Sequence, residues 1–166
     1  AMGMSYPGGV HLDKIAEQGD ENAFTLPHPT VQGSPFDFSF SGLKTAVINL
    51  IHNASQKGEQ LPVADLSASF RKAVVDCLLK NVILAMNETN YKKLVIAGGV
   101  SANSLLRRRL QQECKEKGWE IHMPALNLCG DNAAMVGAQA YYEFLAGKIA
   151  GMDLNACAAM PIDNNF

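Results

Sequence analysis

The chain has 166 residues, of which 48% are hydrophobic and 18% are charged, and its formal net charge is −2. This length and apolar fraction suit a folded domain with a real core, and the near-neutral charge excludes a broad attraction to nucleic acid or membrane. The four cysteines are scattered and form no CxxC pair, which argues against a zinc ribbon or disulfide scaffold and indicates a reducing compartment. No signal peptide and no apolar run of membrane-spanning length is visible, so we expect a cytoplasmic protein.

Residues 1–90 are predicted to be mostly helical. Apolar residues recur at helical spacing in three segments, which span residues 10–18, 42–52 and 62–87. Gly19 is expected to end the first helix, and Ser41 is expected to cap the second. The third segment is apolar nearly all round, so we expect a long helix that is buried on most of its sides.

Two stretches between these helices are expected to be irregular. Residues 20–41 contain three prolines, which disfavour regular structure. We interpret the alternating phenylalanines of this stretch as core anchors of a long loop; they are Phe36, Phe38 and Phe40. Residues 53–60 are polar and predict a mobile linker.

Residues 91–150 predict a βαβα core. Its strands are expected at 93–97 and 119–123, and its helices at 104–117 and 133–146. A strand, a helix and a second strand in this order predict parallel strands with a right-handed crossover. Residues 151–166 are weakly patterned and are expected to fray. The whole chain is therefore expected to form one α/β lobe, rich in helix, with a small parallel sheet.

The most informative stretch runs LVIAGGVSAN over residues 94–103 and predicts a buried strand, a tight turn and the start of a helix. Gly98 and Gly99 allow positive φ and let a ligand approach the backbone. The free N–H groups of the following helix favour an anion or a polar ligand edge. The alternative is an ordinary turn with Ser101 or Asn103 as the helix N-cap.

A second turn, before the helix at 133–146, contains Asp131. Because the carboxyl ends of parallel strands meet at one edge of a sheet, Asn103 and Asp131 are expected to face the same crevice. Asn103 suits a purine edge or a ribose, and Asp131 suits a metal or a ribose hydroxyl. Each residue has the alternative role of an N-cap.

The sequence lacks the patterns of the common hydrolases and metal sites. Its four histidines have no HxxxH or HExxH spacing, and there is no GxSxG elbow, Cys/His signature or Walker A loop. No catalytic residue is assigned on this basis. A group of basic residues either contacts phosphates or forms a solvated helix face; it consists of Arg71, Lys72 and Arg107–Arg109.

Four motifs follow one another in a specific order: SYPGG at 5–9, FDFSFSGLKT at 36–45, IAGGVSAN at 96–103 and CGDNAAM at 129–135. In order and spacing they resemble the motifs of the bacterial-type tRNA N6-adenosine threonylcarbamoyltransferases, a family once described as O-sialoglycoprotein endopeptidases. The match covers nearly the whole chain but only the C-terminal half of the usual family member. The resemblance implies the C-terminal lobe of an actin-like ATPase fold, of the ASKHA or ribonuclease H-like type.

This resemblance implies a tRNA-modifying transferase. The family moves a threonylcarbamoyl group from threonylcarbamoyl-adenylate, its substrate, to N6 of an adenosine beside the tRNA anticodon. By motif match, Gly9 and Asp13 correspond to positions that hold the sugar of the nucleotide, and Asn103 to a position that contacts the nucleoside. Asp131 corresponds to a carboxylate ligand of a divalent metal, which is iron, zinc or magnesium.

The resemblance also implies partners. They are tRNA, an inactive paralogue subunit and a small ATPase subunit, and no membrane is involved. Because the family's metal-binding histidines and phosphate loop belong to an N-terminal lobe, which is absent here, we expect the isolated chain to be inactive. Two alternatives remain: a non-catalytic binding or assembly module of the same complex, and the metallo-glycoprotease of the old family label.

Overall fold

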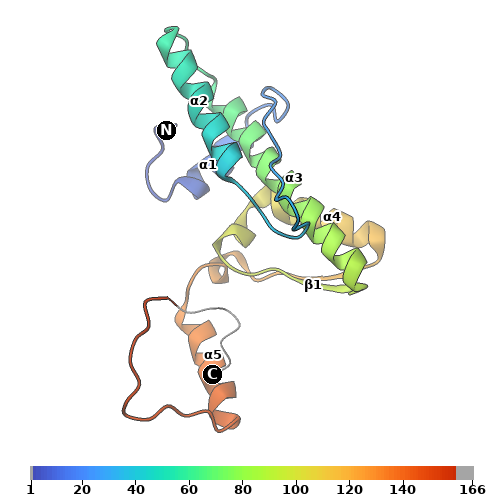
Figure 1. The fold of residues 1–166 in the computed structure, drawn as a ribbon, viewed down its shortest axis with the longest axis vertical. Helices are drawn as coiled ribbons and strands as arrows, with labels where there is room; N and C mark the ends of the chain where they lie inside the picture. The colour runs from blue at the N-terminus through green and yellow to red at the C-terminus, as the bar shows by residue number, and fades with distance from the viewer. Residues whose placement is uncertain (1, 160–166) are drawn as a thin grey trace. The chain divides into compact units, whose positions relative to one another are not determined.

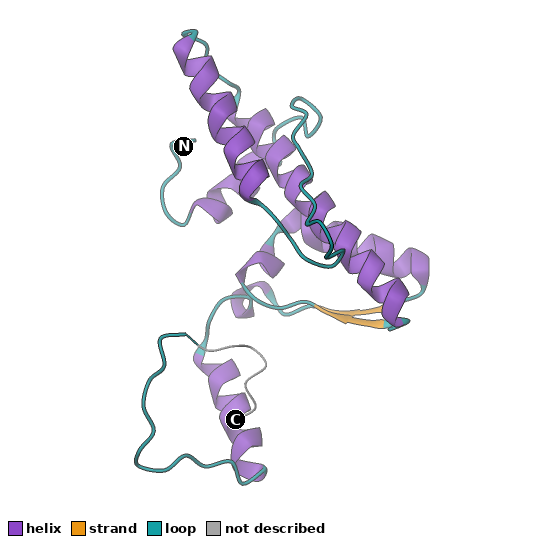
Figure 2. Cartoon of the chain, in the orientation of Figure 1, coloured by secondary structure: helices purple, strands orange, loops and turns teal. Residues whose placement is uncertain are grey.

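The computed structural model describes residues 2–159, and the chain divides into two compact units, Ala1–Cys129 and Gly130–Phe166. Within the described residues the first unit contains four α-helices and a two-stranded parallel sheet, and the second contains one α-helix (Figures 1 and 2). Both units together give an α/β protein. No helix among residues 2–159 is long and apolar enough to cross a membrane.

The elements of the first unit, in chain order, are α1 (Gly8–Ala16), α2 (Ser41–Gln56), α3 (Val63–Thr89), β1 (Lys93–Val95), the 3-10 turn η1 (Gly99–Ala102), α4 (Ser104–Lys117), β2 (Glu120–His122) and the 3-10 turn η2 (Leu126–Leu128). The second unit holds α5 (Ala133–Leu145). The predicted tail at 151–166 is irregular as far as residue 159, and residues 160–166 lie outside the described part.

Helix α3 organises the first unit, because apolar clusters lie along its whole length. Near its start, Ala73 packs with Leu43 and Val47 of α2. Farther along, its side chains pack against α4 and the sheet; this cluster is built on Val75, Leu79, Leu105, Leu106 and Leu110. Near its end, Met86 packs with Cys114 and Trp119. The prediction of a long helix buried on most sides is therefore confirmed.

The predicted strand–helix–strand unit is also confirmed. Strands β1 and β2 are parallel, and Leu94 lies opposite Ile121. The pairing continues past β1, because the N–H of Ile96 donates to the carbonyl of His122 at 3.1 Å. Helix α4 has the predicted bounds, and Gly118 ends it in the left-handed conformation with φ +66°. Each strand has three residues and is shorter than predicted, and the expectation of a buried strand at β1 is wrong, because Val95 is 70% exposed and only one face of the strand packs on the core.

Helix α2 differs from its prediction at both ends. Phe40 occupies the N-cap position, so the expectation that Ser41 caps this helix is wrong. The helix continues to Gln56, so the first half of the predicted mobile linker is helical. The physical reason is burial: Ala54 is buried and extends the apolar face of the helix by one more turn.

Two other predictions about the first half of the chain are corrected. Helix α1 ends at Ala16 with Glu17 as its C-cap, before Gly19 is reached. The phenylalanines of the irregular stretch are 38–46% exposed, so they do not anchor the loop in the core; they are Phe36, Phe38 and Phe40. Instead, the rings of Phe38 and Phe40 stack on each other with centroids 6.1 Å apart, which shields part of their apolar surface.

Candidate functional site

The turn between β1 and α4 is shaped by Gly98 and Asn103. Gly98 has φ +85°, a conformation that residues with a side chain rarely adopt, and its carbonyl accepts from the N–H and the hydroxyl of Ser101 at 3.0 and 2.6 Å. After η1, Asn103 Oδ1 accepts a hydrogen bond from the N–H of Leu106 at 2.9 Å. The N-cap role is therefore confirmed for Asn103, whereas Ser101 folds back onto the turn.

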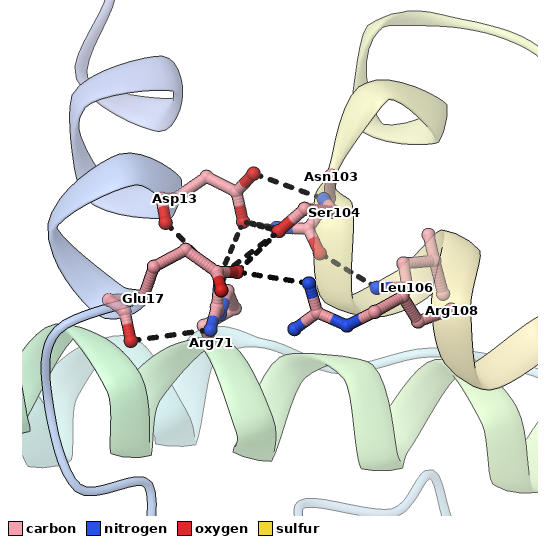
Figure 3. Close-up of polar contacts among 8 residues, drawn as sticks. Asp13, Glu17, Arg71, Asn103, Ser104, Leu106 and Arg108 are labelled. Carbon is pink, nitrogen blue, oxygen red and sulfur yellow. Dashed lines mark hydrogen bonds and ion pairs between the residues drawn. The ribbon is translucent and has the colours of Figure 1, made fainter.

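The other end of the Asn103 amide reaches α1. Its Nδ2 donates to Asp13 Oδ1 at 3.1 Å, across 90 positions of sequence (Figure 3). The neighbouring Ser104 adds its N–H to Asp13 Oδ2 and its hydroxyl to Oδ1, each at 3.0 Å. The Asp13 carboxylate thus lies against the N-terminus of α4, where free N–H groups and the helix dipole favour a negative charge.

Arg71, from α3, forms an ion pair with the same carboxylate. Its side chain is only 5% exposed, and its NH1 lies 3.0 Å from Asp13 Oδ1, 3.1 Å from the carbonyl of Asp13 and 2.6 Å from Glu17 Oε1. Its NH2 donates to the carbonyl of Ala16 in the last turn of α1. One buried guanidinium therefore fixes the end of α1 and two of its carboxylates at once.

Glu17 completes this network. Its Oε1 accepts hydrogen bonds from Arg71 at 2.6 Å and from Arg108 at 3.2 Å, and it lies 2.9 Å from the hydroxyl oxygen of Ser104, whose single proton it shares with Asp13 Oδ1 (Figure 3). The bond from Arg71, followed by the bond from Ser104, lowers the pKa of Glu17 from its ordinary 4.5 to about 2. Glu17 is therefore ionised at neutral pH and shares the neutralisation of Arg71 with Asp13.

A pocket of about 420 Å³ lies above this network, between the start of α1 and the β1–α4 turn. Its lining residues are Pro7, Gly9, Val10, Asp13, Gly99, Val100, Ala102, Asn103 and Leu126. A Cβ added at Gly9 or at Gly99 would meet no atom within 4 Å, so both glycines border open space. The pocket combines apolar walls with a carboxylate and an amide, a mixture suited to a ring system that carries hydroxyl groups.

The pocket brings together three of the four residues assigned from the sequence, namely Gly9, Asp13 and Asn103. Other hollows of about 440 and 330 Å³ lie beside α2 and beside the loop before it. None of the assigned residues lines either of these hollows. The 420 Å³ pocket is therefore the candidate site, although it is not the largest hollow.

Asp131 lies in the second unit, and its side chain is exposed. The cap of α5 is the neighbouring Asn132, whose Oδ1 accepts from the N–H of Met135 at 3.0 Å, so the N-cap interpretation of Asp131 is wrong. That Asp131 shares a crevice with Asn103 stays a prediction. Among residues 2–159, no group of three or more histidine, cysteine or acidic side chains has the arrangement of a metal site. As a hard oxygen donor, Asp131 fits a divalent metal as one ligand among several.

The basic cluster is not uniform. Arg71 is buried, so neither the phosphate-binding nor the solvated-face interpretation describes it. The other members are engaged within the chain: Arg107 donates to backbone carbonyls, while Lys72, Arg108 and Arg109 lie beside Asn22, Glu17 and Asp76 respectively. These contacts tie α4 and α3 to their neighbours and account for the positions of the basic side chains.

Reasoning from the sequence missed Glu17, Arg71 and Ser104. A signal for Arg71 was present, because it lies four and eight residues before Val75 and Leu79, which are buried on the same face of α3. An arginine in phase with a buried stripe needs anionic partners. Nothing in the local pattern of Glu17 or Ser104 indicates that the two residues meet.

Comparison of the sequence with known proteins identifies the family of this chain. Residues 1–138 match the family described as tRNA N6-adenosine threonylcarbamoyltransferase. Proteins with this name from Clostridium botulinum (strain Kyoto) and Clostridium beijerinckii are 46% and 43% identical over 156 residues, which is 94% of this chain and 46% of each relative. One from Moorella thermoacetica is 41% identical over 162 residues, or 98% of this chain and 47% of the relative. The chain spans about half the length of these relatives, and it belongs to the tRNA N6-adenosine threonylcarbamoyltransferase family.

Proposed function

We propose that this chain supplies the nucleoside-binding part of a tRNA N6-adenosine threonylcarbamoyltransferase, within the C-terminal lobe of an actin-like ATPase fold. The whole enzyme would transfer a threonylcarbamoyl group from threonylcarbamoyl-adenylate to N6 of an adenosine beside the tRNA anticodon. The observation that carries the proposal is the convergence of Gly9, Asp13 and Asn103 on one pocket. The names of the relatives support the same reaction class.

In this pocket the adenylate would be held by shape and by two polar groups. Val10, Val100 and Leu126 offer apolar walls for the purine ring. The Asp13 carboxylate would accept a ribose hydroxyl. Asn103 uses one N–H of its amide for Asp13, which leaves the second N–H to donate to the nucleoside. These groups would hold the adenylate in place for attack by the adenosine amine, so their contribution is positioning.

Asp131 would hold a divalent metal together with ligands that lie outside the described residues. When bound, such a metal supplies Lewis-acid polarisation of the carbamoyl carbonyl or neutralises phosphate charge. The side-chain oxygens of Asp131 would contribute one hard, anionic ligand. Its exposure on the described unit supports this role, because a ligand shared with another part of an enzyme must be accessible.

The proposed partners are tRNA, an inactive paralogue subunit and a small ATPase subunit. The chain's net charge of −2 gives no broad positive surface for tRNA. Its contribution to tRNA binding would therefore be local, and the larger electrostatic share would come from other parts of the assembly.

Calorimetric titration with AMP tests the pocket directly. Asn103→Ser keeps an N-cap oxygen for α4 but removes the amide, and we expect it to weaken AMP binding by about tenfold. Asn81→Ser is the matched control, because Asn81 bonds the carbonyl of Asp37 and does not line the pocket. Binding should persist without added Mg²⁺ or Zn²⁺, since Asp131 alone makes no metal site. Equal AMP affinities for the wild type and Asn103→Ser, or no binding by the wild type, would contradict the proposal.

A further inference from the structure

We propose that Arg71 is a positioning residue for nucleotide recognition, which acts through the carboxylate of Asp13 and makes the pocket selective for a ribose with free hydroxyl groups. This inference rests on the proposed function and extends it to a residue outside the pocket. Arg71 does not line the pocket and is 5% exposed, so its effect on a ligand passes through the residues it contacts, of which Asp13 lines the pocket.

The two oxygens of Asp13 are engaged unequally. Oδ1 accepts from Arg71 NH1 at 3.0 Å and from Asn103 Nδ2 at 3.1 Å, which fills two acceptor positions, and it shares the single proton of the Ser104 hydroxyl with Glu17. Within the described residues, Oδ2 accepts one hydrogen bond, from the Ser104 N–H at 3.0 Å. A carboxylate oxygen offers about two acceptor positions, so Oδ1 is saturated and Oδ2 keeps one position for a ligand hydroxyl.

Arg71 fixes this unequal use of the two oxygens because it hydrogen-bonds both the side chain and the backbone of Asp13. NH1 lies 3.0 Å from Oδ1 and 3.1 Å from the carbonyl oxygen of the same residue. NH2 is anchored on the carbonyl of Ala16, which belongs to the last turn of α1. A planar guanidinium can satisfy acceptors in this fixed arrangement, whereas the point charge of a lysine cannot.

The ion pairs of Arg71 with Asp13 and Glu17 are not explained by folding stability alone. Arg71 is buried, and its Nε has no hydrogen-bond partner in the described structure. A buried ion pair of this kind carries a desolvation cost that often cancels its Coulombic gain. Its distinct effect is geometric: it joins α1, α3 and α4 around Asp13, whose two carboxylate oxygens are both hydrogen-bonded (Figure 3).

The test compares two probes, AMP and 2′,3′-dideoxy-AMP, by calorimetry on the 166-residue chain. The ratio of their dissociation constants measures recognition of the ribose hydroxyls, and we expect about tenfold or more for the wild type, as for loss of one hydrogen bond to a charged group. Arg71→Met should bring this ratio close to one. Lys72→Met is the matched control on the next residue of α3, since Lys72 bonds Asn22, and it should keep the wild-type ratio.

A second pair of variants keeps the test decisive if Arg71→Met does not fold. Proline is tolerated at the first position of a helix, and Asn103 has φ −59° and ψ 124°, which suits a residue before proline. Ser104→Pro therefore removes the N–H that orients Oδ2, whereas Ser104→Ala loses only the hydroxyl. We expect the probe ratio to fall further in Ser104→Pro than in Ser104→Ala.

The outcomes separate this inference from the proposed function. A wild type that binds neither probe overturns the nucleotide pocket, and this inference with it. A wild type that discriminates, beside an Arg71→Met variant with the same ratio, overturns the role of Arg71 and leaves the pocket intact. An unchanged ratio in Ser104→Pro overturns the assignment of Oδ2 as the acceptor of the ribose hydroxyl, and a wild type that binds both probes equally overturns the selectivity for that hydroxyl; either result overturns this inference and leaves the pocket intact. Equal weakening of both probes in Arg71→Met would mark the residue as purely structural and would also overturn it.

Discussion

Replacing Glu17 with glutamine should make the chain less stable at neutral pH but not at low pH. The substitution keeps the size of the side chain and one oxygen acceptor, and it removes the charge that faces Arg71 and Arg108. In the folded chain the pKa of Glu17 lies at about 2, below its ordinary 4.5. A depressed folded-state pKa contributes stability that is fully present above about 4.5 and is lost as the pH falls toward about 2.

The size of the effect follows from the pKa difference and from exposure. One pKa unit corresponds to about 1.36 kcal/mol, so a fall from 4.5 to about 2 would correspond to roughly 3 kcal/mol for a shielded carboxylate. The side chain of Glu17 is 46% exposed, and solvent screens its ion pairs. We therefore expect Glu17→Gln to lose about 1 kcal/mol of unfolding free energy at neutral pH.

Urea denaturation of the wild type and Glu17→Gln at pH 7, 4 and 3 would measure this difference. The gap in unfolding free energy should be largest at pH 7 and should shrink steadily below the ordinary pKa of 4.5. Glu59→Gln is the control, because Glu59 is an exposed residue in the loop after α2, and it should show no such trend. A gap that stays constant over this pH range would refute the assignment of the effect to ionised Glu17.

Two further predictions concern packing around the same helices. Gly19→Ala should lower the free energy of unfolding by about 1–3 kcal/mol through overpacking, because the added Cβ would collide with the backbone of Ala64 and lie 2.7 Å from the N of Asp65. Thermal unfolding would detect this loss, and an unchanged midpoint would contradict the prediction. Leu110→Ala should lower the free energy of unfolding by about 2–5 kcal/mol, since Leu110 is 2% exposed in the cluster between α3 and α4. Urea denaturation at one pH would measure this loss. A loss below about 1 kcal/mol would contradict the prediction and would show that the neighbouring side chains fill the cavity.

The elements with strong periodicity could be predicted from the sequence. Helix α4 has the bounds expected from its apolar spacing and from Gly118, and the parallel pairing of β1 with β2 follows from the strand–helix–strand order. The errors fall where tertiary contact decides the outcome. Helix α2 runs one turn beyond its prediction because Ala54 finds a buried place, and the exposed Phe38 and Phe40 stack on each other. Propensity alone does not predict either contact, because the burial of Ala54 and the stacking of the two rings depend on what packs against them in the folded chain.

The motifs predict which residues line the candidate site, but they do not predict which residues hold those side chains in place. Gly9, Asp13 and Asn103 were assigned through motifs, and the fold brings them to one pocket. The sequence places Arg71 in a basic cluster that contacts phosphates or faces solvent, whereas in the structure its side chain is buried against Asp13. Its role depends on contacts among α1, α3 and α4, which the local sequence does not predict. The one local signal of its burial is that Arg71 lies on the same face of α3 as the buried Val75.

Asn103 shows why stability and binding must be measured separately in this chain. Its Oδ1 caps α4 through Leu106, and its Nδ2 holds Asp13, so one amide serves both the helix and the pocket. Removing it weakens the folded state and loosens Asp13 in the same step, and a loss of binding alone would not tell the two effects apart. The ratio of the dissociation constants of AMP and its dideoxy analogue separates the two effects. Unfolding lowers the apparent affinity for both probes equally, whereas a displaced Asp13 weakens the binding of only the probe that carries ribose hydroxyl groups.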